Sequence, residues 1–416
     1  MPRLWTTLAL SLMVVLVPSA RAEWTRFRGP NGTGNVSIRD LPLQWSPEHF
    51  LFRISLPGSG HSSPIVVDNK VILQSATDSR REILCFDAQS GKQLWTQALP
   101  GHLSRIHRKS SYASSTPCSD GKHVFSVCWD GDNVSLCCHD LGGKLRWQRD
   151  LGKFTSQHGP GFSPVVVDDK VIVNNDQDGT AVVQAFDAVS GKPAWKVERK
   201  AFRACYSTPH LMEHQGQKQL IVTSTSGITA YDPATGKELW NYTWSFTGMP
   251  LRTVASTLLA DDHIVAFAGD GGGARGMIGV KVGGQGDVTA SHHGWSRDKG
   301  TPYVPTPVAY QGHLYGVLDN GLAFCLEAKT GNEVWLGRLA GPVSASPVLI
   351  NGKVLVCDEK GDVFFFAADP AGLKIVGRNR LGEPIIATPA VANDRIFIRG
   401  EKNLFSIGAK NATSQP

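Results

Sequence analysis

The 416-residue sequence has no segment in which apolar residues recur every three to four positions, which excludes a solenoid of stacked helices. It also has no low-complexity linker that would separate two modules. Its apolar stretch Leu8–Val17 is too short to cross the roughly 30 Å of membrane hydrocarbon. These absences favour a single strand-rich domain.

The first residues have the pattern of an export signal. Arg3 precedes the apolar stretch, and Ala20-Arg21-Ala22 is a small-x-small cleavage site, so we expect the mature chain to begin at Glu23 in the periplasm or outside the cell. No cysteine follows the cleavage site, so lipid attachment there is not expected. The net charge is +6, and it is +4 without Arg3 and Arg21, which is not the footprint of a nucleic-acid-binding protein.

Eight cysteines in an exported chain raise the question of disulfides. Cys85, Cys138 and Cys325 occupy one position in different repeats, too far apart to pair, so packing explains them better. Two pairings stay open: Cys118 with Cys128, in neighbouring strands of one repeat, and a vicinal ring between Cys137 and Cys138.

The most informative pattern present is a repeat. An Asp, a Gly-Lys pair and then a Trp recur with nearly constant spacing, and each copy follows a Ser-Pro or Thr-Pro pair by about 20 residues. The tryptophans of the copies are Trp95, Trp147, Trp195, Trp240 and Trp335, and the prolines that precede the copies begin at Pro64. The mean step is about 46 residues, if a degenerate unit at Ser256-Thr257 fills the one double gap.

Each repeat contains strands. Pro164–Val173 reads as two β-branched runs joined by an Asp-Asp turn, and two further strands follow before the next repeat. Four short strands for every 40–50 residues, repeated radially, are typical of a β-propeller blade. We therefore predict an all-β, eight-bladed β-propeller with four-stranded blades.

The two ends of the chain fit a closed ring. The last repeat, Pro389–Ile407, lacks its Trp strand, whereas Leu51–Gly58 aligns without gaps to the Trp strand Leu94–Gly101. An N-terminal strand that completes the last blade would remove an open sheet edge. The expected organisation is a signal peptide at 1–22, an N-terminal arm at 23–42, the propeller at 43–408 and a disordered tail at 409–416.

These motifs resemble the tryptophan-docking blades of the quinoprotein-type, or PQQ-like, propeller family. That family includes calcium- and PQQ-dependent alcohol and sugar dehydrogenases, and also the non-catalytic propeller of the outer-membrane β-barrel assembly lipoprotein, which is similar in length and blade number. We interpret the five repeat tryptophans as docking residues that hold neighbouring blades together, because a buried aromatic ring removes a large area from water.

The candidate binding site lies where the segments that precede the innermost strands gather at one mouth of the central channel. These segments carry nine cations and only two acids, Asp298 and Glu383. Our candidates for ligand or partner binding at this mouth are His61, Arg108, Tyr112, His158, Arg203, Tyr206, Arg252 and Tyr303. Arginines here could hold a carboxylated ligand or an acidic peptide, since a guanidinium matches a carboxylate with two hydrogen bonds. The alternative is that many of these side chains simply point into solvent.

Two functions remain in view. The first is an exported, monomeric scaffold that binds protein partners or an anionic ligand without a cofactor, possibly in cell-envelope assembly. The second is a PQQ-dependent oxidoreductase, which needs a calcium ion held by several carboxylate and amide oxygens. The scarcity of acids in these segments and the absence of a Cys-x-x-Cys-His haem motif favour the first, and we assign no catalytic or metal-binding residue. The calcium-loop-like Asn174-x-Asp176-x-Asp178-Gly179 has Ala185 where the bidentate Glu belongs, so we interpret it as a turn.

Overall fold

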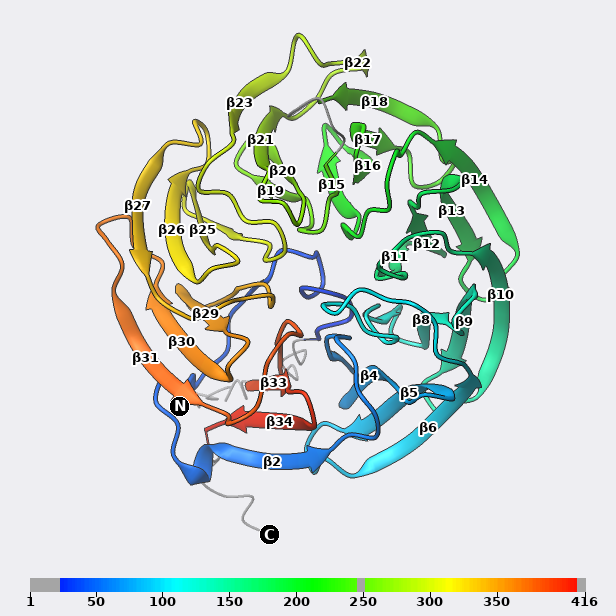
Figure 1. Ribbon diagram of the computed structural model, residues 1–416, viewed down its shortest axis with the longest axis vertical. Helices are drawn as coiled ribbons and strands as arrows, with labels where there is room; N and C mark the ends of the chain where they lie inside the picture. The colour runs from blue at the N-terminus through cyan, green and yellow to red at the C-terminus, as the bar shows by residue number, and fades with distance from the viewer. Residues whose placement is uncertain (1–22, 245–250, 410–416) are drawn as a thin grey trace, which may run out of the picture.

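The computed structural model describes residues 23–244 and 251–409. The predicted signal peptide at 1–22, and all of the predicted tail except Ala409, lie outside these residues. Eight antiparallel sheets are arranged around a central channel like the blades of a propeller (Figure 1). The eight-bladed, all-β prediction is confirmed.

The first four blades follow the chain in order, from the innermost strand outward. Blade 1 contains β3 (Ile65–Val67), β4 (Lys70–Ala76), β5 (Arg80–Asp87) and β6 (Gln93–Pro100). Blade 2 contains β7 (Cys118–Ser119), β8 (His123–Trp129), β9 (Asn133–Asp140) and β10 (Leu145–Lys153). Blade 3 contains β11 (Val165–Val167), β12 (Lys170–Asn175), β13 (Ala181–Asp187) and β14 (Pro193–Arg199). Blade 4 contains β15 (His210–His214), β16 (Gln217–Ser224), β17 (Gly227–Tyr231) and β18 (Glu238–Thr243), with β22 (Gly286–Asp287) added in parallel at its edge.

The other four blades complete the ring. Blade 5 contains β19 (Leu258–Ala260), β20 (His263–Gly269), β21 (Arg275–Lys281) and β23 (His293–Arg297). Blade 6 contains β24 (Val308–Tyr310), β25 (His313–Val317), β26 (Leu322–Glu327) and β27 (Glu333–Arg338). Blade 7 contains β28 (Val348–Ile350), β29 (Lys353–Cys357), β30 (Asp362–Ala367) and β31 (Ile375–Arg380), with β1 (Asn35–Val36) parallel to β28. Blade 8 contains β32 (Ala390–Ala392), β33 (Arg395–Arg399), β34 (Asn403–Gly408) and β2 (Phe50–Ser55), which the short helix η1 (Pro47–His49) precedes.

Strand β2 closes the ring as the sequence predicts. It pairs antiparallel with β34, from Phe50 opposite Ile407 to Ser55 opposite Asn403. Figure 1 shows this N-terminal strand lying beside the C-terminal one. The degenerate unit after Ser256-Thr257 is also a full blade, blade 5.

The recurring Ser-Pro and Thr-Pro pairs form a belt of hydrogen bonds around the channel. At seven of the eight blade junctions, the backbone N–H of one Ser or Thr donates to the hydroxyl oxygen of its counterpart in the next blade, over 2.8–3.1 Å. The last of these bonds, from Thr388 to Ser63, joins blade 8 to blade 1 across 3.0 Å. The hydroxyl recurs at the repeat period because seven of the eight link two blades, and the ring is closed on the inside as well as by β2.

The repeat tryptophans contact the following blade. The indole N–H of Trp95, Trp147, Trp195 and Trp335 donates to a backbone carbonyl near the outer turn of the next blade, over 3.0–3.1 Å. Trp240 instead donates to the Gln219 side chain within its own blade, because blade 5 lacks the Asp-Gly-Lys turn that would receive it. Trp295 of blade 5 makes the same kind of contact, to Ala328 over 3.0 Å, although its repeat is too degenerate for the sequence pattern to single it out.

The N-terminal arm (residues 23–42) begins in the centre of the ring and then passes outward along blades 7 and 8 toward β2 (Figure 1). Trp24 pairs with Val66 of blade 1, and Arg26 donates to the Pro209 carbonyl of blade 4 over 2.9 Å. All three guanidinium nitrogens of Arg28 donate to carbonyl oxygens, including those of Thr306, Pro307 and Pro347 in blades 6 and 7. Burial lowers the pKa of Arg28 to about 9. The arm thus ties distant blades together from inside the channel.

The eight cysteines are all buried and free. Cys118 packs toward blade 3 and Cys128 toward blade 1, on opposite faces of their sheet, so these two cannot pair. Cys137 and Cys138 also pack into different clusters, as successive residues of a strand do, and form no vicinal ring. Packing accounts for the cysteines.

Candidate functional site at the loop mouth

The segments that precede the innermost strands meet at one end of the channel, which we call the loop mouth. Its described parts are residues 58–63, 101–116, 152–163, 200–208, 251–256, 295–306, 340–346 and 382–388. All eight candidate residues lie in these segments, but their surroundings differ.

One group gathers around His158. Its ring lies 6.3 Å from that of Tyr206 and 4.6 Å from that of His107, measured between ring centroids. The Tyr206 hydroxyl is 3.2 Å from the Ser156 hydroxyl. Burial, helped by the charges of Arg252 and Arg203, lowers the pKa of His158 to about 4, so this ring is neutral near pH 7. Loops of blades 2 to 5 therefore converge here.

Arg252 lies beneath the surface of this group. Its side chain is 3 % exposed, and its guanidinium donates to the Ala204 carbonyl over 3.1 Å and lies 3.8 Å from the Asp178 carboxylate. Arg252 therefore connects two segments of the mouth and presents little charge to solvent. Arg203, by contrast, is partly exposed.

Tyr303 borders the same group from blade 6. The guanidinium of Arg275 lies 4.8 Å from the centre of its ring, and burial raises the pKa of Tyr303 to about 12. Its backbone N–H donates to Asp319 over 2.8 Å. Arg275 begins β21 and Asp319 follows β25, so neither belongs to the segments that precede the innermost strands, and the sequence pattern did not indicate them.

The remaining candidates are His61, Tyr112 and Arg108. His61 is half-buried, and desolvation together with the charge of Arg399 lowers its pKa to about 4. Tyr112 faces inward: its ring stacks on Trp129 at 5.6 Å and lies 4.4 Å from the Arg81 guanidinium. Arg108 is exposed. Arg108 follows His107 of the His158 group, and Tyr112 packs on the same hydrophobic cluster as Tyr206, whereas His61 lies nearer Arg399.

Residues 102–113, which we call the crossing loop, extend from blade 2 over the mouth. Lys109 of this loop binds Glu359 of blade 7, with 3.1 Å between Nζ and Oε1. Glu359 also accepts a hydrogen bond of 2.6 Å from Ser344. At the base of the loop, Ala113 accepts backbone hydrogen bonds from His61 and Ser62. The loop thus reaches across the mouth to blade 7, while Trp24, Arg26 and Arg28 of the N-terminal arm are buried within the ring.

Asp176 and Asp178, two acidic residues near the mouth, are engaged by different partners. Asp176 forms a buried ion pair with Arg199, with 2.8 Å between Oδ1 and Nε, and Asp178 accepts from the Ala204 backbone over 2.7 Å. Within residues 23–244 and 251–409, no three His, Cys, Asp or Glu side chains are grouped as a metal site requires. No helix in the same ranges has the length and apolar character of a membrane span.

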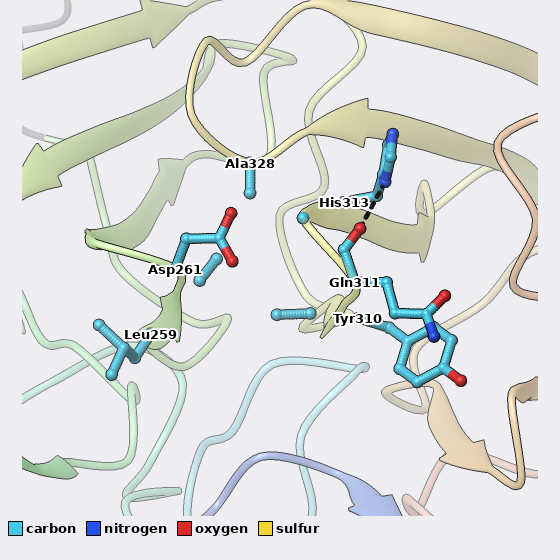
Figure 2. A pocket seen from close by; sticks show the side chains of 9 residues that line it. Leu259, Asp261, Tyr310, Gln311, His313 and Ala328 are labelled. Carbon is cyan, nitrogen blue, oxygen red and sulfur yellow. Dashed lines mark hydrogen bonds between the residues drawn. The ribbon is translucent and has the colours of Figure 1, made fainter.

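A shallow pocket lies away from the loop mouth, at the inner hairpins of blades 5 and 6 (Figure 2). It encloses about 440 Å³, part of which is open solvent, and Asp261 is the one carboxylate among its nine lining residues. His313 is held by the Gln311 carbonyl, 2.9 Å from its Nδ1. We find no convergence of charged groups here comparable to that at the loop mouth.

Known proteins resemble this chain over most of its length. The family model described as outer membrane protein assembly factor BamB matches residues 79–335 and again 286–371. The protein of that name from Moranella endobia (strain PCIT) is 23 % identical over 76 % of this chain and 78 % of its own length.

Solved structures share the fold. BamB from Moraxella catarrhalis superposes with a TM-score of 0.63 at 15 % identity, covering 86 % of this chain and 99 % of that structure. A europium-containing methanol dehydrogenase superposes with a TM-score of 0.67 at 14 % identity, covering 92 % and 90 % respectively. Because both identities are low, the two superpositions establish the propeller fold alone, whereas the sequence match extends over more than half of the chain. The chain belongs to the BamB family of outer membrane protein assembly factors.

Proposed function

We propose that this chain is an exported, non-catalytic propeller that binds protein partners at its loop mouth during assembly of the outer membrane. The observation that carries the proposal is the crossing loop, which reaches from blade 2 to Glu359 of blade 7 and adds exposed side chains to the loop mouth. Membership of the assembly-factor family supports the same role.

Several exposed side chains at the loop mouth are of kinds found at protein interfaces. Leu103 and Phe202 are 59 % and 62 % exposed, and Arg105 and Arg108, on the same loop as Leu103, are exposed too. Aromatic residues such as Phe202 and arginines are enriched at protein interfaces, whereas lysine and acidic residues are depleted there relative to the rest of the surface. The cations favour a partner segment that carries carboxylates, because opposite charges accelerate association and disfavour wrong partners.

The quinoprotein alternative requires a channel that holds a cofactor and a calcium ion. The residues present do not fit that group: Trp24, Arg26 and Arg28 of the N-terminal arm are buried in the channel, and Asp176 and Asp178 are engaged by separate partners. The absorbance spectrum of the purified protein, recorded with and without added PQQ and calcium, tests this alternative directly.

Photo-crosslinking in the native cell envelope tests the proposed interface. A photoreactive residue at Leu103 or Phe202 should give discrete crosslinked products with envelope proteins. Val189 is the matched control, since it is 71 % exposed and lies on an outer turn of blade 3. Equal crosslinking from Val189, or none from the loop mouth, would contradict the proposal.

A charge variant provides the second arm of the test. Replacing Arg105 and Arg108 with Gln should weaken binding of the crosslinked partner roughly tenfold, which corresponds to about 1.4 kcal/mol. Gln at Lys92 and Lys192, two exposed cations on outer turns, should leave the affinity unchanged.

A further inference from the structure

Arg399 is a buried cation whose charge no side chain offsets. It ends strand β33 at the loop mouth and is 1 % exposed. Gly60 and Ala113 cover it: a Cβ built at Gly60 would lie 2.8 Å from both the Arg399 Nη2 and the Ala113 methyl. Among the described residues, no carboxylate lies within 4.0 Å of its guanidinium. Burial lowers its pKa to about 9.

Most of the hydrogen-bonding capacity of Arg399 is unused. Its Nη1 donates to the carbonyl oxygens of Ser62, over 3.4 Å, and Gln74. Its Nε and Nη2 have no partner, although both are buried. Arg28, which is equally buried, has a carbonyl acceptor for every guanidinium nitrogen. The protein can therefore satisfy a buried arginine with backbone alone, and at Arg399 it does not.

The connection between blades does not explain why an arginine is present. Gln74 stands at the corresponding place in blade 1, and its amide donates to the Ser115 carbonyl of blade 2 over 2.8 Å. Arg399 makes the same link from blade 8 to Ser62 of blade 1 with Nη1. A glutamine is sufficient for the link between blades, so the Nε and Nη2 groups of Arg399 are not needed for it.

We propose that the Nε–Nη2 edge of Arg399 binds a small carboxylate anion of the size of formate or acetate. Nε and Nη2 lie side by side in the plane of the guanidinium, and two parallel N–H groups match the two oxygens of a carboxylate. A bound anion would offset the buried charge and the unpaired donors together. This site is independent of the proposed partner surface, because Arg399 is covered and Leu103 and Phe202 are exposed.

Thermal unfolding of the purified full chain tests the site. At constant ionic strength and neutral pH, replacing chloride with formate or acetate should raise the melting temperature saturably, by about 2–4 °C, because a ligand that binds only the folded state stabilises it. Arg399→Gln should remove this response while retaining the link between blades. Arg39→Gln, which alters an arginine that is 83 % exposed, should keep the response.

Two results of the melting experiment would overturn the proposal. A rise in melting temperature that survives in Arg399→Gln overturns the proposal. An equal rise in melting temperature when the chloride concentration alone is increased also overturns it, because it would show a general salt effect. Should Arg399→Gln fail to fold, a crystal structure of the unaltered protein soaked in formate decides. Two oxygens within about 2.7–2.9 Å of Nε and Nη2 would support the site, and a single water there would overturn it.

Discussion

At the scale of single residues, the repeated signature is a contact between a glycine and a tryptophan of the preceding blade. Gly191 has φ +66°, and a Cβ at this position would lie 2.5 Å from the ring of Trp147. Gly143 and Gly236 meet Trp95 and Trp195 in the same way. Glycine is required there for two reasons: the backbone is left-handed, and the ring occupies the space of a side chain.

Replacing Trp147 with Ala should destabilise the protein strongly. The side chain is 7 % exposed and donates to the Ala188 carbonyl over 3.1 Å, so its removal leaves a cavity and an unpaired acceptor. We expect a loss of about 3–5 kcal/mol in urea unfolding. Trp335→Ala should cost less, because that indole N–H is exposed. Equal costs would mean that burial does not set the strength of these contacts.

At the scale of elements, strand β2 protects the last blade. Phe52 of β2 lies against Gly91 of blade 1 and so takes the place that tryptophan has elsewhere. Phe50 packs near Phe405 of β34, with ring centroids 6.4 Å apart. This one strand therefore covers the edge of β34 and joins blade 8 to blade 1.

Deleting residues 43–57, which contain β2, should expose the edge of β34. An unpaired strand edge is a template for pairing with another chain, so we expect aggregation and a large fall in melting temperature. Light scattering and thermal unfolding measure both effects. A truncated protein that stays monodisperse and melts with the full-length chain would show that the belt of hydroxyl hydrogen bonds is sufficient to close the ring.

At the scale of the whole molecule, histidines buried in several blades make the fold sensitive to acid. Desolvation lowers the pKa of His139 to about 4 and that of His210 to about 3. In the unfolded chain these groups bind protons below pH 6.5, whereas in the folded chain they do so only near pH 3 to 4. Stability should therefore be constant above pH 6.5 and fall as the pH decreases from 6.5 to 4.

His139 alone should account for roughly 3 kcal/mol of this fall, by the size of its pKa shift. Urea unfolding across pH 4–7 measures the slope. His139→Gln should flatten it, since glutamine does not titrate. An unchanged slope in this variant would assign the acid sensitivity to other groups.

The sequence alone determined the ring. Each blade makes the same contacts with its neighbour, so the residues that make them recur at the blade period. These residues are the Ser-Pro and Thr-Pro pairs, the Asp-Gly-Lys turns and the tryptophans. For the same reason, the sequence predicted that the strand missing after Pro389 is supplied by the matching strand at Leu51. The repeat pattern did not predict a docking role for Trp295, because its blade lacks the rest of the signature.

Only the tertiary structure decided what the non-repeating residues do. Arg252 and Arg108 are alike as cations in the sequence, yet one is buried against Ala204 and the other exposed. The bond from Lys109 to Glu359 joins residues 250 positions apart, and Arg28 meets Thr306 across 278 positions. Each of these contacts occurs once in the molecule, so no repeating pattern in the sequence predicts it. They depend on which loops the closed ring brings face to face.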